Sequence, residues 1–185
     1  MKNKFVDSDK FVVSHRSGFT MIELLVVMAV MGLLTSLVIT YSRTGERQIV
    51  LFKDQASLIS LLTKARSLSV GTLGEVVAPC GYGVNFDESG SVIIFKDSSP
   101  GNDPKCLDAD NIYNSGEEKV EEFILNPTLK FDELDLADIV FIPPMPKVVI
   151  DNDKTKLEAI IKIKSISGSG ERAIKVTNAG QITAQ

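Results

Sequence analysis

An unbroken apolar run from Phe19 to Tyr41 limits what this chain can fold into more than any other feature of its sequence. Its 23 residues, as an α-helix rising 1.5 Å per residue, span about 35 Å. The hydrocarbon core of a bilayer is about 30 Å thick, so such a helix crosses it with a modest tilt. The sequence therefore predicts a membrane-spanning helix over residues 19–41.

The segments that flank the run indicate its orientation. Four basic residues precede it, against Asp7 and Asp9: Lys2, Lys4, Lys10 and Arg16. This bias keeps an N-terminus in the cytoplasm. No small-residue cleavage site of the ordinary secretory type follows the run, so we expect no cut there. The rest of the chain should then lie outside the cytoplasm.

Glu23 is a carboxylate inside the run, four residues after Phe19. A charged side chain costs about 2.5–3.5 kcal/mol at the centre of a membrane and less near its edge, and it is normally retained for a purpose. One interpretation is that Glu23 reaches the lipid headgroups from about one turn inside the span. The other is that it pairs with a positive charge.

The stretch SGFTMIELLVVMAVMG, residues 17–32, resembles the class III signal of type IV pilins and of the related pseudopilins of type II secretion. The resemblance implies that a prepilin peptidase cuts between Gly18 and Phe19, and that Phe19 becomes the N-methylated terminus. It also implies that Glu23 pairs with the terminal ammonium of a neighbouring subunit during assembly. Pairing offsets part of the cost of burying both charges, so it favours one axial register.

Removal of residues 1–18 as a leader also removes His15, the only histidine. Ser/His/Asp and Cys/His nucleophilic sites and nearly all zinc-water sites need a histidine, so we expect no enzymatic activity. The chain carries 20 Lys and Arg against 24 Asp and Glu, a net charge of −4, and the body of the chain has no basic cluster. We therefore do not expect nucleic acid as a partner.

A helical pattern continues beyond the span. Apolar residues recur with nearly 3.6-residue spacing from Glu46 to Val70, and Gly71 is the expected helix end. Residues 42–71 are therefore predicted to form an amphipathic continuation of the helix. The charged residues, Asp54 among them, are expected mostly outside its apolar stripe. That stripe is expected to comprise Ile49, Phe52, Ala56, Ile59 and Leu62, widened by Leu58, Leu61, Ala65 and Leu68.

Short strand patterns fill residues 72–185. YGVNF (82–86) and SVIIF (91–95) flank the turn DESG and predict a hairpin, and DIVFI, LEAIIKIKSI and RAIKV predict further strands. Pro143, Pro144 and Pro146 predict an extended crossing rather than a central strand. GSGERA (168–173) fits a dinucleotide-binding pattern, but no helical pattern follows it, so we expect a hairpin loop.

These patterns predict an α+β fold, in which a long N-terminal helix packs on a mostly antiparallel β-sheet domain, as in pilins. The segments CGYGVNFDESGSVIIFKD (80–97) and ERAIKVTNAGQI (171–182) resemble the GspH/FimT group of minor pseudopilins. The expected organisation is a leader over 1–18, a transmembrane and assembly helix over 19–41, the amphipathic continuation over 42–71 and an extracytoplasmic domain over 72–185.

Cys80 and Cys106 are the only cysteines. An oxidising compartment outside the cytoplasm predicts a disulfide between them, which contributes on the order of 3 kcal/mol.

The stretch DADNIYNSGEE holds four oxygen-bearing residues that suit a calcium ion, Asp108, Asp110, Asn114 and Glu118. Their spacing departs from the EF-hand loop, so an ordinary acidic loop is the alternative. No other cofactor is expected.

The function that follows from these features is structural. We expect a minor pilin or pseudopilin that is processed by prepilin peptidase and held in the bacterial cytoplasmic membrane. It then joins other pilin subunits through its helix, with an inner-membrane assembly platform as a further partner, in a type II secretion pseudopilus or a type IV pilus. Two alternatives remain open: a signal-anchored extracytoplasmic binding domain, and a pseudopilin for DNA uptake.

Overall fold

The computed structural model describes residues 18–71, 79–99, 106, 109–114, 116, 118–144, 147–168 and 170–185. Most of the leader, Asp108 and Pro146 lie outside the described residues. The chain divides into two compact units, residues 1–42 and 43–185, which are described separately below.

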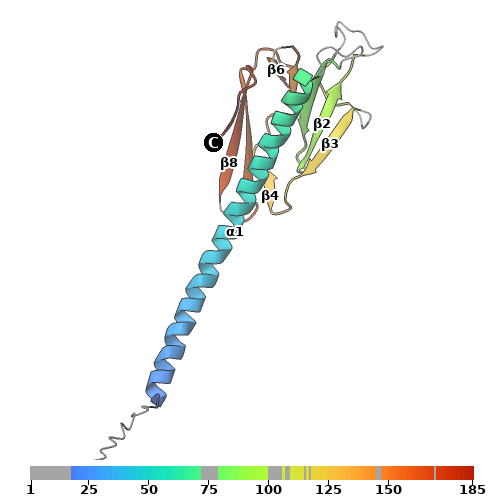
Figure 1. Cartoon of the computed structure of the whole chain (residues 1–185). Helices are drawn as coiled ribbons and strands as arrows, with labels where there is room; N and C mark the ends of the chain where they lie inside the picture. Colours follow the sequence, from blue (N-terminus) through green and yellow to red (C-terminus); the bar gives the residue numbers. More distant parts are fainter. Residues whose placement is uncertain are drawn as a thin grey trace, which may run out of the picture. The chain divides into compact units, whose positions relative to one another are not determined.

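A single α-helix, α1 (Met21–Gly71), runs through both units (Figure 1). In the first unit, Met21–Ile39 is long and apolar enough to cross a membrane, at about 28 Å for its 19 residues, and none of it is buried. Its two hydroxyls bond to the helix backbone: Thr35 donates to the carbonyl of Met31 (2.7 Å) and Ser36 to that of Leu33 (2.9 Å). These bonds satisfy polar groups that lipid cannot.

Two antiparallel sheets make up most of the second unit. The first has the strand order β3-β2-β1-β5-β6, and the second the order β4-β7-β8-β9. The first sheet contains β1 (Gly81–Phe86), β2 (Ser91–Asp97), β3 (Lys119–Ile124), β5 (Asp138–Ile142) and β6 (Lys147–Ile150). The second contains β4 (Leu129–Phe131), β7 (Glu158–Ser165), β8 (Glu171–Thr177) and β9 (Ile182–Ala184).

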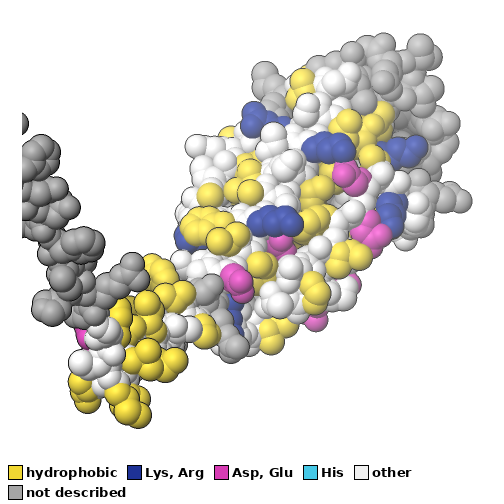
Figure 2. Space-filling view, turned by 60° about the horizontal axis from the view of Figure 1, so that its bottom comes forward, with side chains coloured by type: hydrophobic (Ala, Val, Ile, Leu, Met, Phe, Trp, Pro, Cys, Tyr) yellow, Lys and Arg dark blue, Asp and Glu magenta, His cyan; other side chains and the backbone are white. Residues whose placement is uncertain are grey.

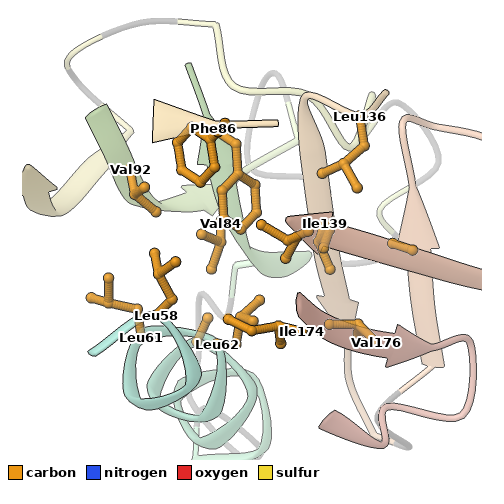
Figure 3. Close-up of a cluster of buried hydrophobic side chains, with 14 of the residues drawn as sticks. Leu58, Leu61, Leu62, Val84, Phe86, Val92, Leu136, Ile139, Ile174 and Val176 are labelled. Atoms are coloured by element: carbon orange, nitrogen blue, oxygen red, sulfur yellow. The ribbon is translucent and has the colours of Figure 1, made fainter. Parts of the chain in front are cut away.

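The second half of α1 lies against both sheets and closes one core with them (Figure 1). In Figure 3, Leu58, Leu61 and Leu62 of α1 point toward side chains from the first sheet, such as Val84, and from the second, such as Ile174. Each fully buried side chain of this kind contributes about 1.5–3 kcal/mol relative to exposure. The fold class is therefore α+β, as predicted, and consistent with the pilin fold.

The buried face of α1 is rotated from the predicted stripe. Ile49 (68% exposed) and Phe52 (50%) face outward, as does Ala56, whereas Leu51 is buried. The prediction that Asp54 lies off the buried face was wrong, because its carboxylate accepts the backbone N–H of Asn126 at 2.7 Å. Both errors arise because burying a polar residue costs little free energy when that residue is hydrogen-bonded. A prediction from apolar periodicity instead places every polar residue on the exposed face.

The predicted hairpins are confirmed. β1 and β2 pair antiparallel around DESG, where Gly90 adopts φ +92°. β7 and β8 also pair antiparallel, and only the start of GSGERA lies between them, because Glu171–Ala173 already belongs to β8. The extended crossing predicted at the prolines was wrong. Pro143 and Pro144 form a turn, joined by a cis peptide bond, and β5 pairs with β6 directly beyond it. A turn removes the need for ladder hydrogen bonds that proline cannot donate.

A second, smaller cluster covers the opposite face of the first sheet. The ring of Phe95 lies over Gly83 and packs against Tyr113, with 5.5 Å between the aromatic centroids. Tyr113 belongs to the connection between β2 and β3, so this residue of the connection lies against the sheet.

Candidate functional site

The start of α1 is built by its own first residues. Thr20 immediately precedes the helix, its hydroxyl oxygen accepts the backbone N–H of Glu23 (3.3 Å), and its carbonyl accepts that of Leu24 (3.2 Å). Thr20 is thus the N-cap residue, and Thr20 with Glu23 has the Thr-x-x-Glu spacing of a capping box. The sequence interpretation missed this role, although the spacing is a recognised signal for a helix start.

The predicted cleavage and methylation residues lie just before the cap. Gly18 and Phe19 lie outside the helix, and Phe19 is 79% exposed. A methyl group added at Gly18 would meet no atom within 4 Å. The bond between Gly18 and Phe19 is therefore exposed, with no described residue packed against Gly18.

Glu23 is exposed in the first turn of α1. A carboxylate there interacts favourably with the positive end of the helix dipole. A cut before Phe19 places an ammonium beside that same positive end, which is unfavourable. Glu23 offsets this repulsion and can also pair with an ammonium on another chain.

Away from this site, Cys80 and Cys106 form a disulfide, the pairing named from the sequence. Of the predicted calcium ligands, the three that the structure describes bond to one another: Asn114 donates its side-chain amide to Asp110 (2.8 Å) and its backbone N–H to Glu118 (2.9 Å). Among the described residues, no group of three or more His, Cys, Asp or Glu is arranged to hold a metal ion.

Two buried carboxylates hold the connection that contains Tyr113. Asp97 accepts the backbone N–H of Asn111 (3.1 Å), and Asp138 accepts that of Tyr113 (3.4 Å) and the side-chain amide of Asn85 (3.0 Å). Burial raises the pKa of Asp97 to about 6, although the Asn111 hydrogen bond opposes the shift. Burial also raises the pKa of Asp138.

Stability should fall as pH rises through about 6. Because the folded pKa of Asp97 exceeds its ordinary value of 3.8, the folded state binds this proton more tightly than the unfolded state. That stabilisation is complete below the ordinary value and is lost as pH rises through the raised one. We expect Asp97 to contribute a loss of about 1 kcal/mol between pH 5 and pH 8. Thermal unfolding followed by circular dichroism across this range measures it.

Asp97→Asn is the control, since its side-chain oxygen still accepts the Asn111 N–H. The variant should show a shallower loss of melting temperature with pH, and Asp138, whose pKa is raised in the same direction, should account for part of what remains. Asp110 and Glu118 also face Asp97 and add to its shift by repulsion. An unchanged pH profile in Asp97→Asn would contradict the assignment.

Comparison with known proteins concerns the site at the start of α1. Residues 13–39 match the model of the prokaryotic N-terminal methylation motif, a stretch that contains Gly18, Phe19 and Glu23. No curated protein and no solved structure matches the chain. The motif and the capped apolar helix agree in position, and this chain therefore carries the prepilin signal of type IV pilin-like proteins.

Proposed function

We propose that this chain is a minor pilin or pseudopilin, a structural subunit rather than an enzyme. Prepilin peptidase cuts it before Phe19, and the mature protein stays in the cytoplasmic membrane until it joins a filament of other pilin subunits. That filament is a type II secretion pseudopilus or a type IV pilus. The observation that carries the proposal is the methylation motif at the start of a single helix, Met21–Gly71.

The surface of the helix supports storage in a membrane followed by assembly. Large apolar side chains from Met21 to Ile39 are all about half exposed or more, and they dominate the visible surface of this part of the chain (Figure 2). Water disfavours such a surface, so it needs lipid or other apolar helices around it. Small residues such as Ala29 and Gly32 permit close approach of neighbouring helices.

Variants of Glu23 test the assembly step. Glu23→Ala should still insert into the membrane but should enter filaments at least tenfold less well, because the ammonium of a neighbouring subunit loses its partner. Glu23→Gln should fail equally: glutamine still fits the capping box but carries no charge. The measurement is the ratio of protein in the sheared filament fraction to protein in the membrane pool, by immunoblot in a host that assembles the filament.

The matched control is Thr20→Ala, which removes the cap at a cost of about 1 kcal/mol and keeps the charge. It should enter filaments nearly as well as the unaltered chain. Normal incorporation of Glu23→Gln would show that Glu23 serves only the helix start. Absence of the unaltered, processed chain from every filament would favour a signal-anchored surface domain instead.

A further inference from the structure

An open groove of about 740 Å³ lies in the second unit, along β7. One wall is the segment Glu133–Leu136, and the other runs from Lys156 to Lys162. The buried side chains of Leu136, Ile150 and Ala159 contribute to its lining. Its volume is within the range of about 300–1,000 Å³ that binding pockets usually have.

One wall of this groove is an unpaired strand edge. β4 pairs with β7 only at Ile163–Ser165, so among the described residues no strand pairs with Glu158–Lys162 on that side. The carbonyl of Lys162 accepts the N–H of Asp132, on the side of β4. Because peptide groups along an antiparallel strand alternate in direction, those of Ile160 and Glu158 also point away from β8, into the groove.

The chain turns away from this edge at Glu133. Its φ of +47° is in the left-handed region, which is uncommon for a residue other than glycine. The backbone hydrogen bonding from β4 to β7 therefore ends at Asp132, and the strand position beside Ile160 is left open. Unpaired edges of this kind bind other chains unless they are protected.

The charges around the groove are mainly negative. Glu88, Glu133 and Asp135 line it and make no salt bridge within the described part of the chain. Two further lining residues are already paired, Glu158 with Lys175 and Lys156 with Asp151. Among the lining residues, Lys162 is the one cation outside these salt bridges, against the three carboxylates of Glu88, Glu133 and Asp135. Leu157 (69% exposed) and Ile160 (41%) add apolar surface at the opening.

We propose that this groove binds an extended, basic segment of a partner protein, which adds to the open edge of β7 in line with β4. The backbone of the segment bonds to Ile160 and Glu158, as in other cases of strand addition. Apolar side chains on one face of the segment enter the groove, and lysine or arginine side chains on the other meet the carboxylates. The five residues Glu158–Lys162 match a segment of about 17 Å. This inference stands apart from the proposed filament role.

The test uses the full chain in an uncharged detergent and a fluorescent heptapeptide of alternating lysine and valine. Anisotropy should show saturable binding, which the glutamate–valine counterpart and a peptide N-methylated at alternate residues should lack. The double variant Glu88→Lys with Asp135→Lys should bind at least tenfold more weakly. Glu171→Lys, a single charge reversal on β8 outside the groove, should stay within twofold.

The backbone step is tested separately. Ile160→Pro removes one N–H that faces the groove and leaves the β8 side of the strand intact, so it should also weaken binding at least tenfold. Hydrogen exchange of the amides of Glu158 and Ile160 in the unaltered chain should slow when the peptide binds. Absent binding, equal weakening by Glu171→Lys, or unchanged exchange at these amides would each overturn the proposal.

Discussion

Gly18→Val should abolish processing, so that the membrane-extracted protein keeps its first 18 residues and its Met1 terminus. In the proposed function the cut falls after this glycine, which lies within the N-terminal methylation motif at residues 13–39. A Cβ atom added there meets no described atom within 4 Å, so the variant should fold and insert like the unaltered protein. Its failure would therefore report recognition by the peptidase. Intact mass and N-terminal sequencing after co-expression with a prepilin peptidase measure the outcome.

Gly45→Ala is the control, because it too replaces a glycine whose added Cβ atom would meet no atom within 4 Å, but within α1. It should be cut fully and should yield a methylated Phe19. If the unaltered chain keeps Met1, or is cut beyond Tyr41, the peptidase does not act at Gly18 and the apolar run is an ordinary anchor or secretion signal.

The sequence correctly predicted those parts of the fold that depend on local patterns of apolar and turn residues. The end of α1 at Gly71 and the hairpin around DESG were predicted nearly to the residue. β3 was missed because its sequence, KVEEFI, lacks the alternation of a half-buried strand; it is an edge strand with Val120 and Ile124 exposed. β4 and β9 have only three residues each, too few for a period to appear.

The candidate sites also differ in whether local sequence patterns could predict them. Gly18, Phe19 and Glu23 lie close together in the chain, within the matched motif, so their spacing alone indicated the signal. The groove along β7 joins residues 133–136 to residues 156–162, and only the pairing of the strands brings them together. The buried carboxylates Asp97 and Asp138 were likewise not predicted from the sequence. Each is the end residue of a strand, where an aspartate is typical of a turn.

Gly83→Ala should lower the free energy of unfolding by about 3 kcal/mol, and the melting temperature by about 10 °C, through overpacking. A methyl group at Gly83 would lie 2.4 Å from Cζ of Phe95 and 3.0 Å from Cγ2 of Val140. Phe95 is fully buried and packed against Tyr113, so its ring cannot move away from Gly83 without displacing Tyr113. Thermal unfolding of the full chain in detergent, followed by the β-sheet signal in circular dichroism, measures the loss.

A double-mutant cycle separates this contact from a general intolerance of β1 to alanine. Phe95→Leu removes the far end of the ring, so Gly83→Ala should cost at least 1 kcal/mol less in that background than in the unaltered chain. Gly45→Ala, with open space around it, should be neutral or slightly stabilising, since alanine is the better helix former. Strictly additive effects of Gly83→Ala and Phe95→Leu would mean that the ring does not set the requirement for glycine, and that the cost arises in the backbone of β1.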